Sequence, residues 1–177
     1  MNPLTIHTVE TAPEHSRATL SALGQEIGFV PNMAGAMAES PSLLAGFAAL
    51  RKAAASSTLS PVEREAVALA TGVALGAPYT SAAHGAVLAM VGAEEASIAA
   101  IRRGDAPADE CLALLTALAT AVATGSARVP ATAEACFNAG FTPRHVYDVV
   151  LVVSMATLVA RAHDVAGVAV DAQFGGK

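Results

Sequence analysis

The segment GAPYTSAAHG, residues 76–85, holds a histidine in a frame of small residues. On a helix, Ala77, Thr80 and His84 follow the spacing i, i+3, i+7 and therefore share one face. Two thiols and a histidine at this spacing would form a redox site, but neither Ala77 nor Thr80 carries sulfur. The imidazole of His84 is the group left to do chemistry in this frame.

A carboxylate on the preceding predicted helix, residues 60–75, is the second candidate group. The apolar stripe of that helix consists of Val62, Ala66, Leu69 and Val73. At about 100° per residue, Glu65 lies about 40° from Leu69, at the edge of the stripe, whereas Glu63 and Arg64 are expected to face solvent. The wheel alone favours Glu65 as a rim carboxylate that reaches water; the alternative is a carboxylate that leans inward.

His84 also leans toward an apolar face, because it shares that face with Val87, Leu88 and Val91. A lone histidine in such a place is usually a satisfied core residue. Two inward-leaning ionisable groups on consecutive antiparallel helices, joined by the short segment 76–78, favour a different interpretation. A carboxylate beside an imidazole holds its tautomer and raises its basicity, which is the basic unit of general acid–base chemistry.

The elements that must position these groups are predicted to be helices. Ser40-Pro41, Ser60-Pro61 and Thr142-Pro143 are typical N-caps followed by proline at the first helical position. The β-branched run 149–153 allows a short buried strand as an alternative, but its spacing favours helix. Helices are predicted at 13–26, 33–38, 41–55, 60–75, 79–91, 94–101, 107–124, 131–138 and 143–166. We therefore predict one all-α domain over residues 1–177, with a frayed tail at 173–177.

The composition excludes several function classes. The net charge is −5, only 14% of residues are charged, and no basic cluster occurs, so nucleic acid and anionic membranes are poor candidate partners. No Cys/His pairing of the zinc type is present, and no metal or organic cofactor is indicated. Apolar residues make up 54% of the chain and the mean hydropathy is +0.51, from which we expect a homo-oligomer that buries additional apolar surface.

Localisation follows from what the sequence lacks. The most apolar run, Val149–Ala160, is too short to span a bilayer and is bounded by Asp148 and Arg161. No signal peptide is visible, so we expect a cytoplasmic protein. Cys111 and Cys136 lie on different predicted helices and are interpreted as small hydrophobic residues.

One stretch resembles a known family: LSPVEREAVALATGVALGAPYTSAAHGAVLAMVGA, residues 59–93, is similar to the signature of the carboxymuconolactone decarboxylase and alkylhydroperoxidase D-like superfamily. Glu65 and His84 match the glutamate and histidine of its peroxidase branch. Ala77 and Thr80 stand where the two cysteines of the Cys-x-x-Cys motif would be. The likeness to the peroxidase-related subgroup extends from about residue 17 to residue 171.

The resemblance implies an all-helical bundle that assembles as trimers or hexamers, with sites near subunit contacts. It also implies a substrate-binding or second polar shell that includes Arg161, although Thr157 and Ala160 replace asparagines that often precede that arginine. Thiol peroxidase chemistry needs sulfur at both motif positions, so it is excluded at this site and no hydroperoxide turnover is expected. His163 and Asp164 form a further polar pair on the same predicted helix, at a surface or subunit contact.

Three functions remain. The first is a cysteine-independent acid/base enzyme of the decarboxylase or lyase type, in which Glu65 and His84 move a proton on a small carboxylated or lactone substrate and Thr80 donates to an oxyanion. Tyr79 is a further candidate acid, and packing is its alternative role. A variant makes Thr80 a nucleophile with His84 as its base. The second is a catalytically degenerate scaffold or a ligand-binding oligomer. The third is a protein that would be called a peroxidase because of its sequence similarity but that does not turn over hydroperoxides.

Overall fold

Capping signals in the sequence start most of the helices of the chain. In the computed structural model, which describes residues 4–175, Ser60 and Thr142 each form a capping box with the residue three positions on. The Ser60 hydroxyl accepts the Glu63 N–H at 3.2 Å, and the Glu63 carboxylate accepts the Ser60 N–H at 2.7 Å. Both helices then begin with proline, whose missing N–H costs nothing at that position.

The described residues form helices and no strand. The helices are α1 (Glu14–Ile27), α2 (Asn32–Met37), α3 (Pro41–Ala55), α4 (Pro61–Ala74), α5 (Pro78–Met90), α6 (Glu95–Arg103), α7 (Glu110–Ala123), α8 (Val129–Asn138), α9 (Pro143–Ala166) and the 3₁₀ turn η1 (Ala172–Phe174).

These helices confirm the predicted all-α class and every predicted helical segment. The run 149–153 lies inside α9, so the strand alternative is wrong. Helix α7 begins at Glu110, later than predicted, because the Asp109 carboxylate accepts the Leu112 N–H at 2.8 Å and fixes the start. The tail is also more ordered than expected, since η1 forms at 172–174; the rest of the predicted frayed segment, beyond residue 175, lies outside the described residues.

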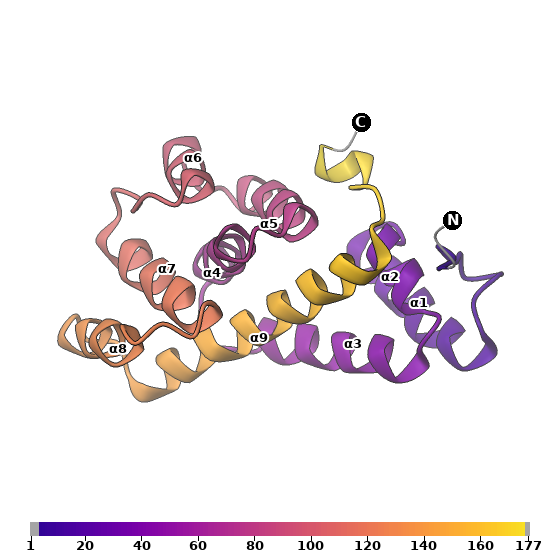
Figure 1. Cartoon of the computed structure of the whole chain (residues 1–177), viewed down its shortest axis with the longest axis horizontal. Coiled ribbons are helices and arrows are strands. Elements are labelled where there is room, and N and C mark those ends of the chain that lie inside the picture. Colours follow the sequence, from indigo (N-terminus) through magenta and orange to yellow (C-terminus); the bar gives the residue numbers. More distant parts are fainter. Residues whose placement is uncertain (1–3, 176–177) are drawn as a thin grey trace.

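Helix α9 is the element around which the others are arranged. It runs from α8 to α2, between a group formed by α1–α3 and a group formed by α4–α7 (Figure 1). Val149, Val152 and Ala156 on α9 are fully buried with Leu69 of α4 and Leu115 of α7. By length and composition α9 is the one helix in the described part that could cross a membrane, but its contacts on both sides make it a core helix.

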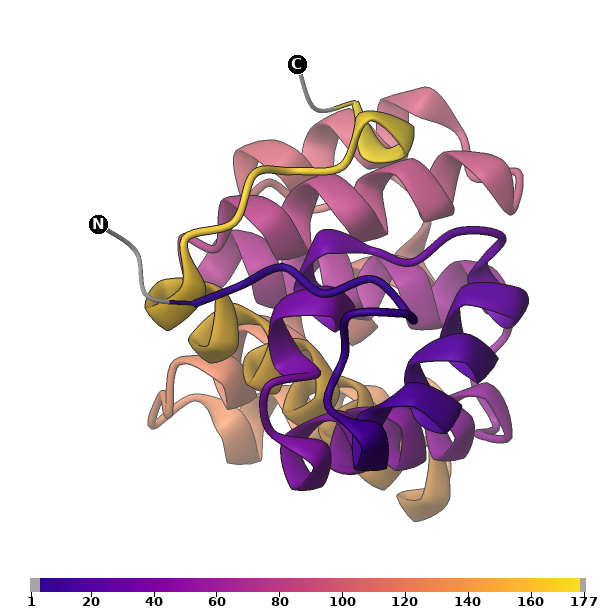
Figure 2. The same cartoon turned by 90° about the vertical axis from the view of Figure 1, so that its right-hand side faces the viewer.

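The segment after α9 is tied back onto α2 and α5. The Asp171 carboxylate accepts the Asn32 N–H at 2.9 Å and the Tyr79 hydroxyl at 2.5 Å. The Phe174 ring lies 5.4 Å from that of Phe29. As a result the segment crosses the outside of the molecule and places η1 against α5 (Figure 2).

Helices α4 and α5 pack closely because Gly72 has no side chain. A Cβ atom at Gly72 would lie 2.9 Å from the Ser81 nitrogen and hydroxyl oxygen and 3.0 Å from Cγ2 of Thr80. The connection is short: the Ala77 N–H donates to the Gly72 carbonyl at 2.8 Å, and Gly76 takes a positive φ of 61°. This packing sets the distance between side chains on the facing sides of the two helices.

We expect Gly72→Ala to destabilise the protein by about 1–3 kcal/mol, because the new methyl group meets backbone atoms of α5. Gly46→Ala is the matched control, since a Cβ there meets nothing within 4 Å and alanine favours the helix by about 0.5–1 kcal/mol. Urea unfolding of both variants tests this. Equal stabilities for the two variants would contradict the close approach.

Candidate active site

Glu65 on α4 and His84 on α5 meet across the close helix pair. Nδ1 of His84 donates to Oε2 of Glu65 at 2.7 Å. Glu65 is only 8% exposed, so the expectation of a rim carboxylate that reaches water is wrong. The helical wheel describes one helix at a time, whereas α5 covers this edge of α4. The alternative, an inward carboxylate beside the imidazole, is the arrangement that forms.

Arg64 holds the second oxygen of the same carboxylate. Its Nε donates to Oε1 of Glu65 at 3.2 Å, and its side chain is mostly covered rather than in solvent as expected. Burial raises the pKa of Glu65, but the hydrogen bond and charge of His84 and the charge of Arg64 outweigh that effect and leave the pKa below its usual value. The carboxylate therefore stays ionised at neutral pH and accepts from both neighbours.

The Glu65 carboxylate fixes which nitrogen of His84 is free. A neutral imidazole that donates from Nδ1 carries its lone pair on Nε2. His84 and Glu65 both line a cavity of about 310 Å³. Its apolar wall includes Ile27, Met33, Phe47, Val87, Met155 and Val159. A nitrogen base beside an apolar cavity of this size can act on a small, mostly apolar molecule.

Tyr79 also lines this cavity, but its hydroxyl is already engaged. It donates to Asp171 at 2.5 Å and accepts the Met33 N–H at 3.3 Å. Burial, together with the hydrogen bond to Asp171, raises the pKa of Tyr79 far above its usual value. Its phenol thus ties α5 to α2 and to the C-terminal segment. Asp171 is a site residue that the sequence analysis missed, because no local pattern links it to a tyrosine 92 positions away.

Thr80 and Ala77 do not line the cavity of His84. Thr80 is fully buried against Gly72, and its hydroxyl has no hydrogen-bond partner among residues 4–175. Ala77 is the N-cap residue of α5 and lines a separate, open hollow beside Arg102. The structure therefore brings Glu65 and His84 together but leaves Thr80 and Ala77 on other sides of α5.

Arg161 lies away from this cavity as well. Its side chain is 60% exposed, and its guanidinium donates to Asp164 at 2.9 Å. Of the two residues expected near Arg161, Asp164 accepts this bond from Arg161, whereas Nε2 of His163 bonds the Val168 carbonyl at 3.0 Å and its ring packs on Tyr79. The arginines that line the cavity are Arg64 and Arg51, and neither was predicted.

The two cysteines lie on the other side of the fold. Cys111 is exposed on α7, and Cys136 is buried on α8, where burial raises the pKa of its thiol. Neither lines the cavity of His84, and they form no disulfide. Among residues 4–175, no cluster of three or more His, Cys, Asp or Glu side chains is placed to hold a metal ion.

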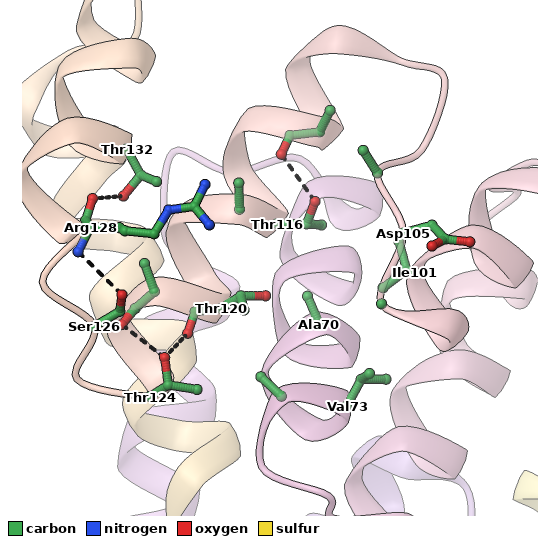
Figure 3. A pocket seen from close by; sticks show the side chains of 16 residues that line it. Ala70, Val73, Ile101, Asp105, Thr116, Thr120, Thr124, Ser126, Arg128 and Thr132 are labelled. Carbon is green, nitrogen blue, oxygen red and sulfur yellow. Dashed lines mark hydrogen bonds between the residues drawn. The ribbon is translucent and has the colours of Figure 1, made fainter.

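A second hollow of about 440 Å³ lies between α4, α7 and α8 (Figure 3). Alanines and threonines form most of its wall, and the hydroxyls of Thr116, Thr124 and Thr132 donate to backbone carbonyls up to four residues earlier. Thr116 donates to the Leu112 carbonyl at 2.7 Å, and Thr124 donates to the Thr120 carbonyl at 2.8 Å. This hollow contains no carboxylate–imidazole pair, so the cavity of His84 is the stronger candidate for an active site.

A protein-family model matches the part of the chain that contains these residues. Residues 41–119 match the model of the carboxymuconolactone decarboxylase family, a range that includes Glu65, Ala77, Thr80 and His84. A search of curated proteins found no match.

Solved structures share the whole fold. The alkylhydroperoxidase AhpD core of Ralstonia eutropha JMP134, an uncharacterized peroxidase-related protein, has a TM-score of 0.83 at 23% identity, covering 96% of this chain and 92% of its own. A peroxidase-related protein of Silicibacter sp. TM1040 has 0.82 at 22% identity, covering 99% and 93%. The C82A variant of the debrominase Bmp8, solved with 2,3,4-tribromopyrrole, has 0.84 at 15% identity, covering 99% and 95%.

At these identities the solved structures establish the fold alone, while the family model matches the segment that holds the carboxylate–imidazole pair. Residues 41–119 thus match the carboxymuconolactone decarboxylase family, and the chain has the all-helical fold of these solved structures.

Proposed function

We propose that the protein is a cysteine-independent acid/base enzyme of the decarboxylase or lyase type, which acts on a small carboxylated or lactone substrate in the cavity of His84. The observation that carries this proposal is the 2.7 Å hydrogen bond between Glu65 and His84 on the wall of an open apolar cavity. An ionised carboxylate on Nδ1 leaves Nε2 as the base and stabilises the imidazolium that forms when it takes a proton.

The proposed reaction breaks the carbon–carbon bond to the substrate carboxylate. Carbon dioxide leaves, and the electron pair of that bond is delocalised into an adjacent carbonyl as an enolate. Nε2 of His84, which has first taken a proton from solvent, donates that proton to the carbon that lost the carboxylate, and Glu65 remains ionised throughout.

Thiol chemistry is not part of the proposal. The positions that match the redox cysteines carry a methyl group at Ala77 and a hydroxyl at Thr80, and neither group can reduce a peroxide. Cys111 and Cys136 do not line the cavity, so they do not supply a thiol to His84. The debromination and peroxidase descriptions of similar structures therefore remain properties of those proteins.

A second candidate is a protein that binds a small ligand in the same cavity without turning it over. The position of Thr80 favours it, because the hydroxyl expected to donate to an oxyanion is buried and does not line the cavity. This function and the enzyme differ in one respect: a ligand binder holds its ligand unchanged during long incubation.

Two further expectations remain proposals. A homo-oligomer, trimer or hexamer, is supported by exposed apolar side chains on α8 and α9, including Phe137, Tyr147 and Val165. A cytoplasmic location is the second of these proposals.

Glu65→Gln and His84→Ala are each expected to lower decarboxylation of carboxylated lactones or β-keto acids by about 10²- to 10⁴-fold, because each removes one half of the proton-transfer pair. Cys111→Ser is the control and is expected to match the wild type, since Cys111 is exposed on α7. Carbon dioxide release and substrate consumption are the measurements. Unchanged turnover in either site variant would refute the proposed roles.

The ionised state of Glu65 gives a stability prediction. Its pKa lies below the ordinary 4.5 in the folded protein, so its contribution is fully present above pH 4.5 and is lost as the pH falls through the lower folded value. The gap in unfolding free energy between wild type and Glu65→Gln should therefore shrink as the pH falls from about 6 to about 3.

Denaturant unfolding across this range measures the gap, with the exposed Glu134→Gln on α8 as control for the loss of a carboxylate. A gap that stays constant or widens toward low pH would show that Glu65 is not held in its ionised form.

A further inference from the structure

Two arginines line the cavity of His84. The resemblance implied that Arg161 binds the substrate, but Arg161 is not one of them. Arg51 comes from α3 and Arg64 from α4, so two helices each contribute an arginine to the lining of the same cavity. Arg161 pairs with Asp164 on the exposed side of α9 and does not line this cavity. The positive groups available to a bound molecule are therefore those of Arg51 and Arg64.

Both guanidinium groups have unused hydrogen-bond donors. Arg51 donates from Nη2 to Glu26 at 2.9 Å, but its Nε is buried and has no partner among residues 4–175. Arg64 donates from Nε to Glu65, and no hydrogen bond to its Nη groups is found in the same part of the chain. The Nε of Arg51 has no surface that a ligand in the cavity could reach, so the donors available to a bound molecule are the Nη groups of the two arginines.

The carboxylates of the cavity are already bonded to side chains of the protein. One oxygen of Glu65 is bound to His84 and the other to Arg64. Glu26 pairs with Arg51 and is more than half exposed to solvent, where water satisfies it. The polar capacity that remains open in the cavity therefore consists of N–H donors together with Nε2 of His84. A ligand that fits must bring acceptors, preferably charged ones.

We infer that the cavity is selective for a small apolar molecule that carries a carboxylate, with the carboxylate held by Arg64 and Arg51 and the apolar body against Met33, Phe47 and Met155. The inference rests on the proposed function only in taking this cavity as the substrate site. Of the two substrate classes proposed above, the inference favours carboxylated molecules over neutral lactones. Because Arg64 also binds Glu65, the ligand carboxylate would lie next to the carboxylate–imidazole pair.

The test is binding of benzoate and of its uncharged analogue benzamide to the full-length protein, measured by calorimetry or ligand-observed NMR. Wild type should bind benzoate at least about tenfold more tightly than benzamide, because charge-assisted hydrogen bonds to guanidinium are the stronger ones. Arg51→Gln and Arg64→Gln should each weaken benzoate about tenfold and leave benzamide unchanged.

Arg103→Gln is the matched control: Arg103 is also paired with a carboxylate, Asp105 at 2.8 Å, but does not line the cavity. It should bind benzoate as wild type does, and so should Arg161→Gln. If Arg64→Gln fails to fold, Arg51→Gln decides, since Arg51 bonds Glu26 and not Glu65. Equal affinity for benzoate and benzamide, or benzoate loss confined to Arg161→Gln, overturns the inference.

The outcome is separable from that of the proposed function. Benzoate binding that depends on both arginines, without any turnover of carboxylated lactones or β-keto acids, would support the inference while the enzymatic proposal fails. Turnover that depends on Glu65 and His84, with benzoate binding indifferent to both arginines, would retain the enzyme and overturn the inference.

Discussion

The close packing of α4 against α5 determines where the ionisable side chains of this protein lie. Gly72 lets the two backbones approach until a Cβ atom would contact Ser81 at 2.9 Å. At that separation Glu65 and His84 reach each other at 2.7 Å without leaving their helices. The site is therefore built on two rigid elements, a short connection and one glycine, which is the arrangement that holds a proton-transfer pair in fixed geometry.

The same packing explains how a carboxylate is kept charged in a mostly apolar environment. Burying an ion without partners would cost several kcal/mol or force it to take up a proton. Here each oxygen of Glu65 has a donor, one from His84 and one from Arg64. Unpaired donors remain on Arg64 and Arg51, which gives the cavity a preference for acceptors that its apolar wall alone would not provide.

Much of the fold could be predicted from local signals, and part of the site could not. The Ser60 and Thr142 caps and the prolines after them act within one helical turn, so the sequence alone reveals them. The pairing of Glu65 with His84 follows from two helices and a short connection. By contrast, the burial of Glu65, the inward position of Arg64 and the Tyr79–Asp171 bond depend on helices packed against one another. No single-helix wheel contains that information.

Glu65 fixes His84 in the tautomer that makes Nε2 a base. Nitrogen NMR of the His84 ring at neutral pH tests it most directly, because the two tautomers give different signals for the protonated and unprotonated nitrogens. We expect a proton on Nδ1 in a strong hydrogen bond, a lone pair on Nε2, and loss of this preference in Glu65→Gln. A proton on Nε2 in the wild-type protein, or a tautomer unaffected by Glu65→Gln, would show that Glu65 does not fix the tautomer of His84.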